Sequence, residues 1–418
     1  MLMIIVGVYS LYVLVSIYTS VMQIGYINQA KRKSAVLLSA SEFLKAGNYA
    51  VEKEKMNILS SFFDYLLFIA WIGFGVTYLS SVLSLENDAM FNITMVMSFV
   101  VINSLFSMPF SYYEKFVLDE KFGFNKSSMA QYIKDTLISF VMTLVFGSLV
   151  VWGIYEIISN FDYWWLWSFA FIFAVVILIN MLYPTFRALF FDKVTPLDNE
   201  ELNAEIKTLM DKTGFVSSGV FISDASKRDA RLNAYFGGLG KTKRVILFDT
   251  LIAKLSTKEL LAVLGHELGH FAHGDIYKNI VLVGVMLFAM FAIFGNLPAS
   301  LYLEMGLSES PYLVMILLLL CMPVLGFIMM PIMGIVSRRN EYAADKMGSE
   351  LGGEAGAIEL ANALKKLVTQ NKSFPLSHPL YIFFHYTHPP VLQRLKALGV
   401  DVGSSDKSAL EGKCEAVL

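Results

Sequence analysis

Two histidines four residues apart bracket a glutamate in the segment VLGHELGHFAHGD, residues 263–275. Residues at this spacing share one helix face, with Cβ atoms about 5–6 Å apart, so the imidazoles of His266 and His270 can converge on one metal ion. Glu267 lies beside them on the helix, where its carboxylate could take a proton from an attacking water as a general base. The spacing therefore predicts a zinc site that hydrolyses peptide bonds.

The third zinc ligand must come from another segment, because a catalytic zinc takes three protein ligands and leaves one position for water. Two apolar runs follow the histidines, and two antiparallel spans return the chain to the same face at SRRNEYAAD, residues 337–345. We expect Glu341 to complete the ligand set and Asp345 to accept a hydrogen bond from the second nitrogen of a ligating histidine. In the alternative interpretation, Glu341 and Asp345 do not serve a metal site and form solvent-exposed ion pairs with Arg338, Arg339 or Lys346.

The helix that carries the two histidines has recognisable ends. Ser256 and Glu259 have the spacing of a capping box, which predicts the start of the helix. Gly274 suits its C-terminal stop. His273 follows the histidine pair but lies about 10 Å along the helix axis from His266, at about 1.5 Å per residue, so we do not expect it to share the ion.

The composition is that of a membrane protein. Of 418 residues, 56% are hydrophobic and 16% are charged, whereas soluble proteins carry about 25% charged residues. The net charge is −2 and no basic run suggests a nucleic-acid partner. A bilayer core about 30 Å thick requires about 20 apolar residues in a helix. Seven stretches meet this requirement: 2–27, 58–84, 90–112, 135–158, 163–190, 276–302 and 312–335.

Lys and Arg are concentrated in every second loop between the apolar stretches. Lys and Arg are frequent between the first two stretches and between the third and fourth, and Lys193 follows the fifth. The loops near residues 86–88, 162 and 304–309 contain neither. Because cytoplasmic loops are enriched in Lys and Arg, we expect the N-terminus outside and every large polar segment in the cytoplasm.

The polar sequence falls mainly into two blocks. The first contains β-branched and aromatic runs that are typical of strands, VFISD at 220–224 and RVILFD at 244–249, and GGLGK at 237–241 predicts a turn after LNAYF. We therefore expect seven transmembrane helices with a zincin-like α+β catalytic domain on the cytoplasmic side. The expected parts are transmembrane helices one to five in 1–192, the first part of the metallopeptidase domain in 193–275, helices six and seven in 276–335 and its second part in 336–418.

The pairing of HELGH with EYAAD resembles the membrane zinc metallopeptidases that include the type I CAAX prenyl proteases. The resemblance extends over most of the chain. It includes FVLDEKFGFNKSS at 116–128, FDKVTPL at 191–197, NAYFGGLGKTKRVILFDTL at 233–251 and HPLYIFFHYTHPPVLQRL at 378–395. It implies a helical membrane barrel around a large chamber, with one zinc ion at its cytoplasmic end. It also implies removal of the last three residues from prenylated CAAX substrates.

The resemblance assigns roles to residues of this chain. It implies His266, His270 and Glu341 as zinc ligands and Glu267 as the base. Asn233 and Ala234 match the strand that holds the substrate backbone in related zinc peptidases. Within HPPVLQRL, His388 and Arg394 match positions expected to steady the oxyanion or the end of the substrate.

Chemistry alone leaves several of these roles open. A histidine near the zinc could donate to a tetrahedral intermediate, and an arginine could hold a free carboxylate through two hydrogen bonds. Asn233 could instead be a turn or strand-edge residue, and Arg394 could form a surface ion pair. His378 and His385 are alternatives to His388, although each fits a structural role.

The expected partners are a peptide or protein substrate, prenylated if the resemblance extends to specificity, and the lipid bilayer; no oligomer is indicated. A rival hypothesis is a quality-control protease for membrane proteins that uses the same residues. Another is a non-catalytic zinc-binding scaffold, against which the intact Glu267 argues.

The segment FAHGD departs from the eukaryotic members of the family, and the tail EGKCEAVL has no dilysine retention signal. These two features, together with the compact polar loops, favour a location in a bacterial inner membrane.

Overall fold

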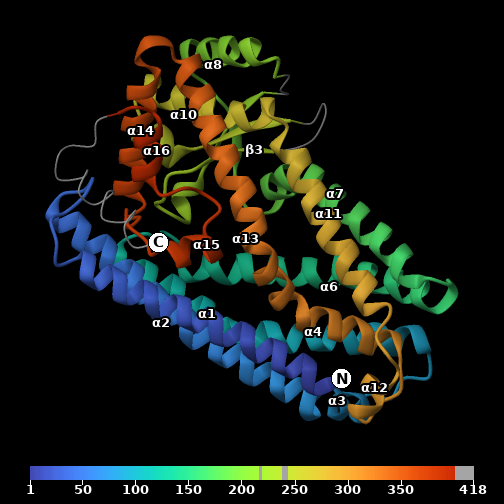
Figure 1. The fold of residues 1–418 in the computed structure, drawn as a ribbon. Helices are drawn as coiled ribbons and strands as arrows, with labels where there is room; N and C mark the ends of the chain where they lie inside the picture. Colours follow the sequence, from blue (N-terminus) through green and yellow to red (C-terminus); the bar gives the residue numbers. More distant parts are fainter. Residues whose placement is uncertain (216–218, 238–242, 401–418) are drawn as a thin grey trace.

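The computed structural model describes residues 1–215, 219–237 and 243–400. Within these ranges seven helices are long and apolar enough to cross a membrane, as expected, and a polar domain covers one end of them (Figure 1). The seven are α1 (Leu2–Ala30), the continuous helix Ala40–Val82 (α2 Ala40–Ala70, η1 Trp71–Gly75, α3 Val76–Val82), the continuous helix Asp88–Phe122 (α4 Asp88–Tyr113, η2 Glu114–Asp119, α5 Glu120–Phe122), α6 (Met129–Asn160), α7 (Trp164–Phe190), α11 (Asp275–Phe294) and α13 (Pro311–Leu351).

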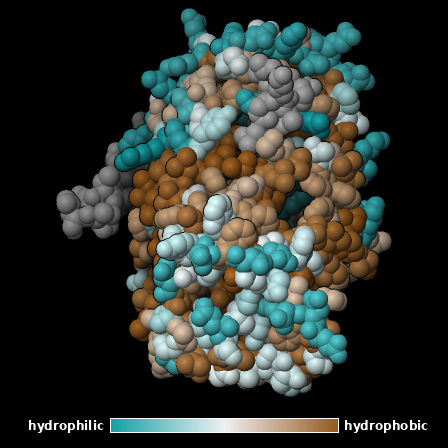
Figure 2. All heavy atoms as spheres, turned by 90° about the vertical axis from the view of Figure 1, so that its right-hand side faces the viewer, coloured by the Kyte–Doolittle hydropathy of each residue, from teal (hydrophilic) through white to brown (hydrophobic). Residues whose placement is uncertain are grey.

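An apolar band runs over the outer surface of these helices below the polar domain (Figure 2). The helices expose many large apolar side chains, among them Leu14, Phe74 and Leu149. Such an extended apolar surface requires lipid contact. Figure 2 also shows a recess in this band, with hydrophilic side chains inside it.

The ends of two spans differ from the prediction. The sixth ends at Phe294 rather than near 302, because Pro298 in the sequence GNLP cannot continue a helix. The seventh was expected to end near 335 but continues to Leu351, because residues 336–347 contain neither proline nor glycine. Glu341 and Asp345 therefore belong to the same rigid helix as the last membrane span.

The polar domain contains a small mixed sheet, as predicted. Its strands are β1 (Val194–Pro196), β2 (Val220–Ser223), β3 (Ala234–Gly237) and β4 (Arg244–Phe248), in the order β1-β2-β4-β3. β2 and β4 are parallel, and the other neighbours are antiparallel. The prediction missed β1 but located the other three strands, and the turn expected at 237–241 lies outside the described residues after Gly237. Among the strands of the described residues, β3 lies at the edge of the sheet, with one side free for pairing.

The polar domain also contains helices. They are α8 (Glu200–Thr213), α9 (Asp249–Ile252), α10 (Thr257–Ala272), α14 (Gly356–Gln370), α15 (Pro379–His385) and α16 (Val391–Ala397), with the short η3 (Ala225–Lys227) and η5 (Gly353–Ala355). The short α12 (Ser300–Glu304) lies at the opposite end of the spans, near the N-terminus (Figure 1). The buried side chains of Leu247, Leu260 and Leu264 belong to one apolar cluster that joins β4 to α10. Residues 401–418 of the last expected part lie outside the described residues.

The histidine helix α10 begins and ends as its sequence predicts. The Ser256 side chain accepts a hydrogen bond from the Glu259 backbone nitrogen, and the Glu259 carboxylate accepts one from Ser256 in return. The helix ends at Ala272, and Gly274 adopts a left-handed conformation with φ of 66°. This turn leads directly into α11.

Candidate metal centre

Small residues bring α10 and α13 into contact backbone to backbone. A Cβ atom at Gly265 would lie 3.2 Å from the Cα of Gly348, and one at Gly269 would lie 2.9 Å from the Cα of Ala344. Helices approach this closely only where side chains are absent or minimal. The contact presses the histidine face of α10 against the face of α13 that carries Glu341.

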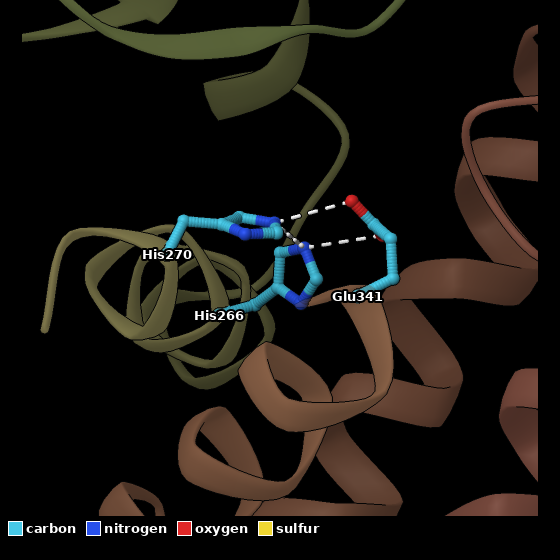
Figure 3. Close-up of side chains that lie close together, drawn as sticks. All are labelled: His266, His270 and Glu341. Carbon is cyan, nitrogen blue, oxygen red and sulfur yellow. Dashed lines mark hydrogen bonds and ion pairs between the residues drawn. The ribbon is translucent and has the colours of Figure 1, made fainter. Parts of the chain in front are cut away.

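The donor atoms of His266, His270 and Glu341 point toward one another (Figure 3). The two Nε2 atoms are 3.2 Å apart. Glu341 Oε1 lies 3.1 Å from Nε2 of His270, and Glu341 Oε2 lies 3.6 Å from Nε2 of His266. One ligand atom from each residue falls within 4.8 Å of the others. Three side chains from two helices thus form a compact candidate metal centre.

The carboxylate of Glu341 fits a bound metal ion. The residue is 2% exposed, and within the described part of the chain its Oε2 atom accepts no hydrogen bond. Buried oxygens that accept no hydrogen bond are rare, and a bound ion is one explanation; among the described residues Oε2 has only ion-pair contacts, with Arg394 Nη1 at 3.2 Å and His266 Nε2 at 3.6 Å. Two imidazoles and one carboxylate are the ligands of many catalytic zinc sites. The donor set therefore fits zinc.

A carboxylate lies against the second nitrogen of each histidine. Nδ1 of His266 is 2.8 Å from Asp345 Oδ1, and Nδ1 of His270 is 2.9 Å from Asp275 Oδ2. Such partners hold the proton on Nδ1 and leave Nε2 free to bind a metal. Asp345 was expected near a histidine, whereas sequence analysis missed Asp275. Its signal was the HGD that ends the motif, since the turn at Gly274 folds the first residue of α11 back toward His270.

Arg394 of α16 is buried beside these groups. Its Nε and Nη2 donate to the two oxygens of Asp345 at 2.8 and 2.6 Å, and Nη1 lies 3.2 Å from Glu341 Oε2. The residue is 7% exposed, so it forms an interior ion pair rather than a surface one. Asp345 and Glu341 are likewise buried and do not pair with Arg338, which donates to the carbonyls of α15 and Tyr386 instead. A contact of Arg394 with substrate remains a prediction.

Glu267, His270 and His388 have perturbed pKa values. Burial raises the pKa of the Glu267 carboxyl, which suits a group that must take and return a proton. Burial would lower the pKa of His270, but its contacts with Glu341 and Asp275 raise that pKa to about 9. His388 places Nε2 3.2 Å from Glu341 Oε1. Its side chain lines a cavity together with His385, Tyr386 and Pro389, and desolvation by the surrounding protein lowers its pKa.

The structure separates the other candidate residues from the metal centre. Asn233 is exposed directly before the edge strand β3, and its side-chain oxygen accepts a hydrogen bond from the Ala234 backbone at 2.9 Å. His273 is exposed and is not part of the ligand group. His385 lies 2.9 Å from the Thr19 hydroxyl, and His378 caps α15.

Comparisons with known proteins agree with this architecture. Residues 196–400 match Peptidase family M48, and residues 23–193 match the CAAX prenyl protease N-terminal family of five membrane helices. CAAX prenyl protease 1 of Saccharomyces cerevisiae is 33% identical over 390 residues, covering 85% of each chain. The CAAX prenyl protease 1 homolog of Homo sapiens is 32% identical over 386 residues, covering 79% of this chain and 76% of its own.

A solved structure has the same fold. The crystal structure of S. mikatae Ste24p superimposes with a TM-score of 0.86 at 30% identity, covering 95% of this chain and 98% of that one. The chain is therefore a multi-pass integral membrane protein. These relatives are eukaryotic, and they give no support to the expected bacterial origin.

Proposed function

This chain belongs to the CAAX prenyl protease 1 family of M48 zinc metallopeptidases, and we propose that it removes the last three residues from prenylated CAAX proteins at the cytoplasmic membrane face. The observation that carries the proposal is the buried centre of His266, His270 and Glu341, which lies where α13 leaves the membrane span. The basic residues concentrated in alternate loops favour a cytoplasmic orientation.

The residues around the centre suit hydrolysis of a peptide bond. One zinc ion, bound by His266, His270 and Glu341, would supply Lewis-acid activation of water. Glu267 would take a proton from the attacking water and pass it to the leaving amine, and its raised pKa favours this exchange. His388, which contacts Glu341 and is open to the cavity, would donate a hydrogen bond to the developing oxyanion.

The free edge of β3 suits the substrate backbone. An extended peptide can add to an edge strand through main-chain hydrogen bonds, whatever its side chains. Asn233 and Ala234, at the start of β3, would make the first of these contacts. Arg394 would act mainly by holding Asp345 and Glu341 in place, since its nitrogens already contact both carboxylates.

The test uses purified full-length protein with zinc in detergent. A farnesylated CAAX peptide, its unprenylated twin and an unfolded membrane-protein fragment are compared as substrates, with Glu267→Gln as the blank. Release of the last three residues from the farnesylated peptide alone supports the proposal. Equal cleavage of all three would indicate a broader quality-control protease, and no cleavage of any would revive the zinc-binding scaffold.

A further inference from the structure

One guanidinium joins the start of β3 to two membrane helices. Arg231 donates from Nη2 to Asp119 Oδ1 at 2.6 Å and from Nη1 to Oδ2 at 3.1 Å. Nη2 also donates to the Tyr49 hydroxyl at 2.7 Å, and that hydroxyl donates to Asp119 Oδ1 at 3.0 Å. Tyr49 belongs to the second span and Asp119 to the third. Both spans therefore reach the segment that leads into the edge strand.

This network is largely buried. Asp119 is 6% exposed and Tyr49 is 8% exposed, and the guanidinium of Arg231 stacks 4.1 Å from the centre of the Phe124 ring. The buried charge is that of Asp119, and burying a carboxylate without its partner is strongly destabilising; Arg231 is partly exposed and also contacts Asp229 Oδ2 at 2.6 Å. Asp119 is the last residue of the π-helical segment η2. Such irregular turns inside helices frequently mark functional positions.

The next two residues are fixed as well. The side chain of Asn371 accepts a hydrogen bond from the Leu232 nitrogen at 2.8 Å and donates one to the Leu232 oxygen at 3.1 Å. The Asn233 carbonyl accepts a hydrogen bond from the Phe248 nitrogen in β4 at 3.2 Å. Three consecutive residues before β3 are thus held by three different parts of the fold, whereas in the described part of the chain β4 is the one strand that pairs with β3.

We propose that Arg231 and Asp119 are positioning residues for substrate binding, because they fix the free edge of β3 relative to the membrane spans and the metal centre. This inference rests on the proposed function, in which that edge binds the substrate backbone. The close contact of α10 with α13 fixes the metal ligands independently of the strand. A peptide binds tightly to β3 only if the strand is already fixed, because ordering a mobile segment on binding reduces the affinity.

The experiment compares Asp119→Asn with Asp135→Asn in the full-length zinc-loaded protein. The Asp135–Arg228 pair is the control, because it also joins a span, α6, to the polar domain at 2.9 Å, with the Asp135 side chain 22% exposed against 8% for the side chain of Asp119. The wild-type protein and both variants are assayed with the farnesylated peptide, and hydrogen exchange is measured at the amides of residues 233–237. Tyr49→Phe is a milder variant of the same network.

We expect Asp119→Asn to raise KM roughly tenfold while kcat changes little, because binding is lost equally in the ground state and the transition state. Exchange at residues 233–237 should accelerate in Asp119→Asn and, to a smaller extent, in Tyr49→Phe, but not in Asp135→Asn. Zinc content should not change in any variant.

Two results would overturn the proposal. One is unchanged exchange at β3 in Asp119→Asn, which would show that the pair does not hold the strand. The other is an equal rise in KM in Asp119→Asn and Asp135→Asn, which would indicate general loosening of the polar domain. If the wild-type protein cleaves no prenylated peptide, the proposed function fails, and the exchange measurement still decides whether the pair positions β3.

Discussion

Gly269 of α10 lies so close to Ala344 of α13 that a Cβ atom at position 269 would be 2.9 Å from the Ala344 Cα. The next turn of each helix repeats the relationship, since Gly348 packs against the backbone of His266. The distance between the two histidines and Glu341 is therefore set by small residues that are not themselves metal ligands.

Replacing Gly269 with alanine should separate the two helices at the level of the ligands. The added methyl group meets backbone rather than a flexible side chain, so α10 must shift, at a cost of about 1–3 kcal/mol of stability. We expect zinc affinity to fall by at least about tenfold, as for other disturbances of ligand orientation. Zinc bound per chain, measured by mass spectrometry after competition with a chelator, tests this.

Gly326→Ala is the control, because Gly326 lies in α13, the helix that packs against α10, and no atom lies within 4 Å of its added Cβ. It should bind zinc as the wild-type protein does. Normal zinc content in Gly269→Ala would contradict the argument from close packing.

Asp275→Asn should weaken zinc binding by about 10- to 100-fold, because the carboxylate orients His270 through Nδ1. An asparagine can present its amide nitrogen to Nδ1 and so stabilise the wrong tautomer of the imidazole. Lys278→Gln is the control, since it removes the 2.7 Å contact to Asp275 but leaves the carboxylate in place. Equal zinc affinity of Asp275→Asn and the wild-type protein in a chelator titration would show that Asp275 has no role at the metal centre.

Glu259 should make stability depend on acid pH. Burial alone would raise the pKa of its carboxyl, but hydrogen bonds from Lys366 and Ser256 outweigh this and lower it. Because the pKa is lower in the folded state, the contribution is present above the unfolded pKa of about 4.3 and is lost as the pH falls further. The difference in Tm between the wild-type protein and Glu259→Gln should therefore be largest near neutral pH and shrink below about pH 4.

Glu350→Gln provides the comparison for this pH series. Its partner Lys346 lies 3.9 Å away and both side chains are exposed, and exposed pairs contribute little to stability. We expect its Tm to follow that of the wild-type protein at every pH. A constant Tm difference between the wild-type protein and Glu259→Gln across the acid range would contradict the argument.

Local patterns were sufficient to predict much of this molecule. Helical spacing placed His266 beside His270, and the return of two antiparallel spans brought Glu341 to them without any knowledge of packing. The capping box at Ser256 fixed the start of α10 within the sequence itself. The seven helices and the strands β2 and β4 follow from composition and residue type, whereas β3 was predicted from the family resemblance.

The rest depends on contacts between distant segments. The pairing of Asp275 with His270 requires the direction in which α11 leaves the turn, which Gly274 alone does not specify. Arg231 pairs with nearby Asp229, but its other acidic partner, Asp119, lies 112 residues away, in a π-helical turn that has no simple sequence signature. A short strand such as β1 carries too few residues for a periodic pattern.

His388→Gln should lower kcat by roughly 100-fold while KM and zinc content stay near the wild-type values, because a donor to the oxyanion acts only in the transition state. His388 lies near the ligand carboxylate of Glu341, so a lower zinc content in the variant would instead indicate a role in metal binding. His385→Gln is the control from the neighbouring α15, where the imidazole contacts Thr19. This variant should affect Tm more than kcat. Equal kcat values for His388→Gln and the wild-type protein on the farnesylated peptide would exclude His388 from the transition state.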